Sequence, residues 1–192
     1  FRIYENVIYI NNYNMKKKII FLDGDGTLWY PQKTKRTQKP HRIYCDDKIK
    51  DNYLEHLDLT PNTKETLQDF KDRWIHLVII SANPNTEDIA IEEIKKRVEY
   101  FWLSEFFYSV RSSDGSNPKW KADIILKMLE NLNISKEHAL MVWDSFYYDY
   151  MPIKEVWIDA LWIKNTVCKL PEVMPADLQS IQEISDILEL LQ

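Results

Sequence analysis

Aspartates follow two short apolar segments of this sequence. Asp23 and Asp25 come after KIIFL, and Asp144 and Asp149 come after ALMVW. Residues two apart in an extended backbone point to the same side, so the carboxylates of Asp23 and Asp25 should lie close together. Converging carboxylates repel one another unless a cation joins them. Mg²⁺ suits such a site, because it prefers oxygen ligands and keeps waters that a phosphate can replace.

Neighbouring carboxylates beside a magnesium ion can divide the work of phosphate ester hydrolysis. One can attack phosphorus and form an aspartyl-phosphate. The other can protonate the leaving group and then activate water. Gly24 and Gly26, two of only three glycines in the chain, would let the backbone turn sharply and bring its amides close to a ligand.

Other ligand-binding motifs do not fit this stretch. It has no third glycine for a dinucleotide fingerprint, and no Walker lysine follows. An EF-hand would need glycine at Leu28 and glutamate at Thr34. Phosphate ester chemistry is therefore the better interpretation of the aspartates.

The elements that must position these residues follow from the apolar pattern. Apolar runs without alternation are typical of strands buried on both faces of a parallel sheet. They occur at 18–23, 76–81, 139–144 and 159–164, with a weaker one at 106–110. Helical patterns separate these strands, so the sequence predicts an α/β fold with a doubly wound, Rossmann-like parallel sheet and helices on both faces.

Four helix starts can be placed. One helix begins at Thr60-Pro61, a second covers 85–99, and a third opens at Asn117-Pro118. Ser180 and Glu183 form the pattern of a capping box before the last helix.

The 192 residues suit one domain with a small insert. We expect that domain to span 15–192, with a flap or cap insert at about 30–59 directly after the first strand. Residues 1–14 are expected to be an extension or an added edge strand. Within the insert, 33–42 carries five cations in an acidic protein. This stretch is either a solvated loop or a flap that attracts anionic substrates.

Ligands of open α/β sheets bind outside the carboxyl ends of the strands. Asp23, Ser81 and Asp144 stand at such ends, and Asp149 follows five residues later. Lys119 stands at a helix start, where its ammonium would add to the anion-attracting backbone amides.

The order of these motifs resembles that of the haloacid dehalogenase superfamily over about residues 18–164. The first motif of that family, an apolar strand followed by Asp-x-Asp-x-Thr, is matched by the run from Asp23 to Thr27. The resemblance implies that Asp23 is the nucleophile and a metal ligand. It implies that Asp25 is the general acid/base and binds the metal through its backbone carbonyl.

The remaining motifs imply further roles. Ser81 would hold the phosphate, together with Lys119 or, as the alternative, Lys121. Asp144 would bind Mg²⁺ directly, and Asp149 would support the metal from behind. Where the family often has Gly or Asp before the last motif's aspartate, this chain has Trp143.

The resemblance therefore predicts a Mg²⁺-dependent phosphatase that acts through an aspartyl-phosphate. The DGDGTLW stretch, the short insert and the helix in DLTPNTKETL resemble the magnesium-dependent phosphatase-1-like, small-cap branch. The expected substrate is a phosphorylated small molecule or a phosphoprotein. A phosphotransferase or mutase sharing the same intermediate stays open as an alternative, as does a non-catalytic phosphate-binding module of the same fold.

Composition limits the partners and the compartment. The net charge of −5 argues against a general nucleic-acid binder, because phosphate backbones attract a surplus of cations. No apolar run approaches the roughly 20 residues of a membrane span, so no membrane partner is expected. Cys45 and Cys168 have no metal-type spacing, and we expect free thiols in a reducing cytoplasm. The sequence does not indicate an oligomeric state.

Overall fold

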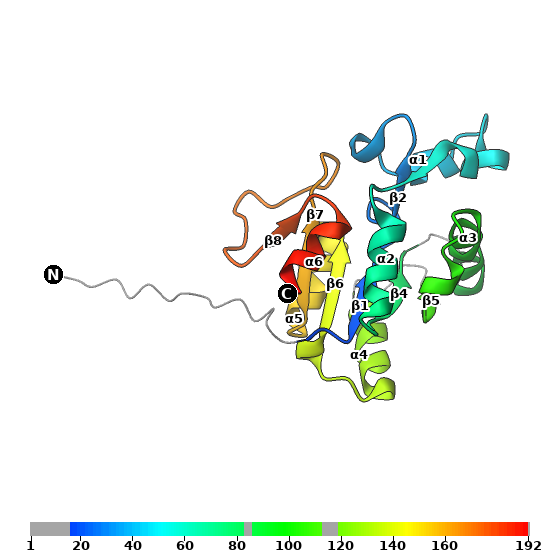
Figure 1. The fold of residues 1–192 in the computed structure, drawn as a ribbon. Coiled ribbons are helices and arrows are strands. Elements are labelled where there is room, and N and C mark those ends of the chain that lie inside the picture. The colour runs from blue at the N-terminus through cyan, green and yellow to red at the C-terminus, as the bar shows by residue number, and fades with distance from the viewer. Residues whose placement is uncertain (1–15, 83–85, 113–118, 192) are drawn as a thin grey trace.

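The computed structural model describes residues 16–82, 86–112 and 119–191. Its centre is a parallel sheet of six strands in the order β5-β4-β1-β6-β7-β8 (Figure 1). The strands are β1 (Ile19–Leu22), β4 (His76–Ile80), β5 (Ser109–Arg111), β6 (Ala139–Trp143), β7 (Asp159–Ile163) and β8 (Gln179–Ile181). The predicted Rossmann-like parallel sheet is confirmed, and five of its strands fall on the five apolar runs.

Helices cover both faces of the sheet, as predicted. The larger elements are α2 (Thr63–Asp72), α3 (Glu87–Tyr100), α4 (Trp120–Leu132), α5 (Met151–Glu155) and α6 (Ile187–Leu190). One apolar core packs α2, α3 and α6 against the sheet, and the other packs α4 and α5 against the opposite face. Strand β1 alternates between them, with Ile20 and Leu22 in the first core and Ile19 and Phe21 in the second. Both faces of the central strand are therefore dry, which explains its continuous apolar run.

The insert after β1 forms a small unit of its own. Strands β2 (Trp29–Pro31) and β3 (Leu57–Leu59) pair in an antiparallel ribbon, and the short helix α1 (His41–Tyr44) lies between them in the sequence. Single 3₁₀ segments flank α1 at Lys35–Thr37 and Lys50–His56. In Figure 1 the insert lies beyond the top end of the sheet, in blue and cyan.

Two cations of the basic stretch hold the insert in place. The Lys35 ammonium lies 2.7 Å from a carboxylate oxygen of Asp58. The Arg36 guanidinium donates two hydrogen bonds, of 2.8 and 2.7 Å, to Glu183 near the C-terminus. Arg36 therefore anchors the insert to the C-terminal segment, and Lys35 braces the insert internally. Attraction of anionic substrates by 33–42 stays a prediction.

The C-terminal segment differs from the prediction. Ser180 is part of β8, and the capping box forms three residues later, between Glu183 and Asp186. Strand β8 went unpredicted because only Ile181 of its three residues is buried. The predicted helix start at Asn117-Pro118 and the predicted extension at 1–14 lie outside the described residues. Among the described helices, none combines the length and apolar character that a membrane crossing requires.

Candidate active site

Strands β1 and β6 bring two of the predicted aspartates together. They pair in parallel with Leu22 beside Val142, so the residues that follow each strand emerge at the same edge. The backbone N–H of Asp23 donates a 2.9 Å hydrogen bond to the carbonyl oxygen of Val142. Asp149 joins the pair from the turn Phe146–Tyr150 that follows β6. Each of Asp23, Asp144 and Asp149 contributes a carboxylate oxygen to a buried cluster in which the three oxygens lie within 4.8 Å of one another.

The two glycines make room for this cluster. A Cβ atom on Gly26, whose φ is +79°, would lie 2.5 Å from Oδ2 of Asp144. A Cβ atom on Gly24 would lie 2.7 Å from the ring of Trp29 and 3.3 Å from the hydroxyl of Ser81. Any side chain at either position would push a functional group away. This explains why a chain with three glycines places two of them here.

A buried lysine lies against the carboxylates. The Lys121 ammonium is 3.1 Å from Oδ1 of Asp23 and 2.5 Å from Oδ1 of Asp149. Lys119 is elsewhere: its side chain is 63% exposed and pairs with Glu155 at 2.7 Å. The structure therefore brings Lys121 to the site and leaves Lys119, the lysine favoured from the sequence, on the surface.

The position of Lys121 has a sequence signal that was overlooked. Lys121 falls in phase with the buried face of α4, four residues before Ile125 and seven before Met128. Lys119 precedes the helix as its N-cap residue. A lysine within an apolar helical stripe must find a buried partner, whereas one at a helix start can remain in water.

Burial and mutual repulsion shift the protonation of this cluster. Burial raises the pKa of Asp144 well above its usual range, and the charges of Asp23 and Asp149 raise it further. Burial likewise raises the pKa of Asp149 to about 6, although the Lys121 ammonium opposes that shift. Burial alone would lower the pKa of Lys121, but Asp149 and Asp23 together raise it. One lysine therefore does not balance three carboxylates, and the site favours an additional cation.

The carboxylate of Asp25 is outside this cluster. Its Oδ1 accepts a 2.7 Å hydrogen bond from the indole N–H of Trp29 and a 2.6 Å hydrogen bond from the Tyr44 hydroxyl. Burial raises the pKa of Asp25, and the positive charge of Arg97 opposes the rise. A carboxyl group with a raised pKa, beside but not within the carboxylate cluster, is suited to donate a proton.

Ser81 lies where the sequence predicts a phosphate ligand. It follows β4, the strand next to β1, and its side chain is buried. The Ser81 backbone N–H donates a 3.2 Å hydrogen bond to the carbonyl oxygen of Arg111, and the Ser81 carbonyl oxygen accepts a 2.7 Å hydrogen bond from the Ser112 hydroxyl. These contacts fix the backbone of Ser81 beside Gly24.

Tyr44 and Arg97 were missed at the sequence level. Tyr44 is in an insert without a long periodic pattern, and Arg97 is one of many charged residues in α3. Neither had a neighbouring motif that would indicate contact with the aspartates.

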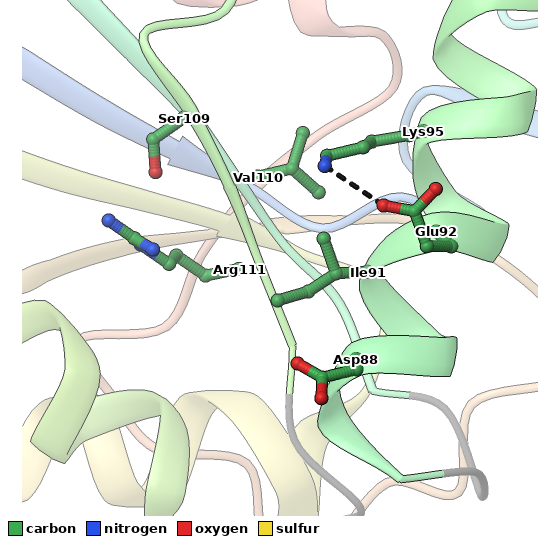
Figure 2. A pocket seen from close by; sticks show the side chains of 7 residues that line it. All are labelled: Asp88, Ile91, Glu92, Lys95, Ser109, Val110 and Arg111. Carbon is green, nitrogen blue, oxygen red and sulfur yellow. Dashed lines mark hydrogen bonds and ion pairs between the residues drawn. The ribbon is translucent and has the colours of Figure 1, made fainter.

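A hollow lies at the outer edge of the sheet, between α3 and β5. Figure 2 shows Ile91 and Val110 facing each other there, while Ser109 and Arg111 point away from α3. Lys95 is paired with Glu92 across one helical turn, at 3.0 Å. Among the described residues that line it, no carboxylates converge as they do at the end of β1.

A family model described as haloacid dehalogenase-like hydrolase matches residues 7–163. The chain belongs to this family. Among curated proteins, none matches the chain.

Solved structures share the fold of this haloacid dehalogenase-like hydrolase. An uncharacterized protein from Listeria monocytogenes serotype 4b is 24% identical, with 91% of this chain and 96% of that one covered and a TM-score of 0.67. A HAD phosphatase from Thermococcus onnurineus is 18% identical, with coverage of 92% and 98% and a TM-score of 0.63. A HAD-superfamily hydrolase, subfamily IA, variant 1, from Geobacter sulfurreducens PCA is 18% identical, with coverage of 92% and 97% and a TM-score of 0.61.

Proposed function

We propose that this protein is a Mg²⁺-dependent phosphatase that hydrolyses a phosphate monoester through an aspartyl-phosphate on Asp23. The observation that carries the proposal is the convergence of Lys121 with the buried carboxylates of Asp23, Asp144 and Asp149. Family membership supports hydrolysis, and one structural neighbour, the HAD phosphatase from Thermococcus onnurineus, agrees with a phosphate ester as substrate.

The donor set fits the proposed metal. Three buried carboxylates whose oxygens converge within 4.8 Å offer the hard oxygen ligands that Mg²⁺ prefers. The carboxylates of Asp23 and Asp144 and the backbone carbonyl of Asp25 would bind the ion directly. Asp149 would stabilise these ligands without binding the metal itself. Bound there, Mg²⁺ would neutralise charge on the phosphoryl oxygens.

The side chains divide the reaction between them. A carboxylate oxygen of Asp23 attacks phosphorus, and the bond from phosphorus to the ester oxygen breaks as Asp25 gives its proton to that oxygen. A water molecule then loses a proton to Asp25 and attacks the phosphoryl group, which releases inorganic phosphate and restores Asp23. Lys121 and Ser81 would bind phosphoryl oxygens during both steps, so that their donors stabilise the transferring group.

The short insert favours the small-cap branch of the family. Its ribbon β2-β3 and helix α1 are too small to form a separate domain over the site. An open site would accept a bulky phosphoprotein as well as a phosphorylated small molecule. A cytoplasmic location remains a prediction from the sequence.

Measurements of phosphate release and of the phosphorylated protein distinguish this proposal from its alternatives. Wild-type protein should release phosphate from a panel of phosphate monoesters in Mg²⁺ and lose this activity in chelator. Asp23→Asn should abolish turnover, and Asp25→Asn should slow it and accumulate protein that is heavier by one phosphoryl group. Phosphate binding without turnover would instead indicate a binding module. A phosphoryl acceptor that outcompetes water would indicate a phosphotransferase or mutase.

A further inference from the structure

A tyrosine of the insert contacts the proposed general acid. Tyr44 is the last residue of α1, and its hydroxyl donates a 2.6 Å hydrogen bond to Oδ1 of Asp25. The indole N–H of Trp29, four residues after Asp25, donates a second hydrogen bond to the same oxygen. Both donors therefore occupy Oδ1, and Oδ2 is the oxygen that the two bonds leave for a proton.

The ring of Tyr44 packs against a buried arginine of α3. The guanidinium carbon of Arg97 lies 4.1 Å from the centre of the Tyr44 ring and 5.3 Å from that of Tyr53. Arg97 is only 3% exposed, so these cation–π contacts are shielded from water. The Tyr53 hydroxyl donates a 3.0 Å hydrogen bond to Glu93, on the same helix as Arg97. Helix α3 thus clamps two insert tyrosines, and only one of them has a hydrogen bond to Asp25 among the described contacts.

We propose that Tyr44 is a positioning residue that fixes the rotamer of Asp25, so that Oδ2 faces the leaving-group oxygen of the substrate. This inference rests on the proposed phosphatase function. The charge of Arg97 over the ring holds the phenol in place, so a side chain of the insert positions the general acid. A general acid must lie within hydrogen-bond reach of the atom that it protonates, and small misplacements are costly.

Leaving-group dependence tests this role. Tyr44→Phe removes one hydroxyl and keeps the ring, and Tyr53→Phe is the matched control in the same clamp. A good leaving group such as 4-nitrophenolate needs little protonation, whereas an alkyl alcohol needs a proton as it departs. For Tyr44→Phe we expect kcat to fall about tenfold or more on an alkyl phosphate and much less on 4-nitrophenyl phosphate, with KM nearly constant. Tyr53→Phe should match wild type on both substrates.

The outcomes distinguish this inference from the proposed function. Equal losses on both substrates, or equal losses in the two variants, would show that Tyr44 only anchors the insert. That result would overturn the inference while leaving the phosphatase proposal intact. A wild-type protein inactive on every ester would count against both. Circular dichroism should show both variants folded, with melting temperatures only a few degrees below wild type, because each variant loses one side-chain hydrogen bond.

A second inference comes from the ends of the helices. Helices α2, α3, α4 and α5 end with the same two backbone hydrogen bonds. In each, a buried or half-buried aliphatic residue donates to a carbonyl five residues earlier, and the residue before it donates to a carbonyl three residues earlier. The residue before each aliphatic one has a φ between +51° and +62°. These four residues are Trp74, Trp102, Asn133 and Trp157.

Tryptophan is an unexpected residue at such positions. Glycine is favoured there and asparagine is tolerated, but a bulky residue with positive φ is an outlier. Trp74, Trp102 and Trp157 are 89%, 81% and 86% exposed, so packing does not compensate for the strain. The chain has 7 tryptophans and only 3 glycines among 192 residues, whereas the usual glycine share of about 7% would give about 13.

We infer that residues 74, 102 and 157 are glycine in the protein as its own cell makes it. The codon UGA accounts for the substitution, because some genetic codes read it as tryptophan and others as glycine. Reading the codons and measuring peptide masses from source cells tests this. We expect UGA at all three positions and glycine in the native peptides. UGG codons, or tryptophan in those peptides, would overturn the inference. Trp29, whose indole bonds to Asp25, is the control and should be encoded by UGG.

Discussion

Replacing Lys121 by methionine is the most informative single perturbation of this site. The substitution keeps a long flexible side chain and removes the cation that lies 3.1 Å from Asp23 and 2.5 Å from Asp149. Lys119→Met is the matched control two residues away, since it removes an exposed lysine that pairs with Glu155. The pair of variants separates a buried role from a surface one at the start of α4.

The two losses should differ by several kcal/mol. Removing one partner of a buried ion pair costs about 3–5 kcal/mol, because the other charge stays buried without compensation. In a chain of this size each kcal/mol shifts the melting temperature by roughly 2–4 °C, so Lys121→Met should lower it by roughly 6–20 °C. An exposed pair contributes about 0–1 kcal/mol, so Lys119→Met should melt close to wild type.

The pH dependence of the Lys121→Met loss supplies a second readout. Burial already raises the pKa of Asp149 to about 6, and removing the Lys121 ammonium raises it further. At pH 5 a protonated Asp149 leaves less uncompensated charge, so the loss should be smaller there than at pH 7.5. Urea unfolding of both variants at the two pH values, in chelator, is the assay. Equal stability of Lys121→Met and Lys119→Met at pH 7.5 would refute the argument for a buried cationic role.

Three further predictions concern the metal, the glycine turn and the helix ends. The pKa values of Asp144 and Asp149 are raised in the folded chain. Without metal, the folded chain therefore binds more protons than the unfolded chain between about pH 4 and 6. Its free energy of unfolding should fall as pH rises through that window. Mg²⁺ competes with those protons, so it should raise the melting temperature more at pH 7.5 than at pH 5, and an equal rise would contradict the site. Gly26→Ala would place a Cβ 2.5 Å from Asp144, so calorimetry should show much weaker Mg²⁺ binding than in wild type, and unchanged affinity would argue against Asp144 as a ligand. The triple variant Trp74→Gly, Trp102→Gly, Trp157→Gly relieves left-handed strain of about 1–2 kcal/mol per site, offset by about 0.4–1 kcal/mol of glycine entropy per site. It should be about 2 kcal/mol more stable in urea, whereas a less stable variant would show that the rings pack in solution.

The apolar pattern of the sequence was enough to predict the fold and the central part of the site. Short continuous apolar runs without alternation are typical of strands with both faces buried, and helical patterns between them favoured the parallel sheet. The aspartates directly after two of those runs then had to meet at one sheet edge. The closeness of Asp23 to Asp144 follows from this rule, and the structure agrees.

Tertiary packing decided the rest, because the deciding contacts join residues far apart in the sequence. The choice between Lys119 and Lys121 depended on which side of α4 faces the sheet, and the ion pair of Lys121 with Asp23 spans 98 residues. The bond from Tyr44 to Asp25 depended on where an insert without regular periodicity folds back, and that place is set by anchors such as Arg36 on Glu183. Strand β8 formed because β7 offered it an open edge, whereas its own three residues have little apolar signal. Sequence patterns report the burial of a single element, but the partner of a charged side chain is fixed only when separate elements pack together.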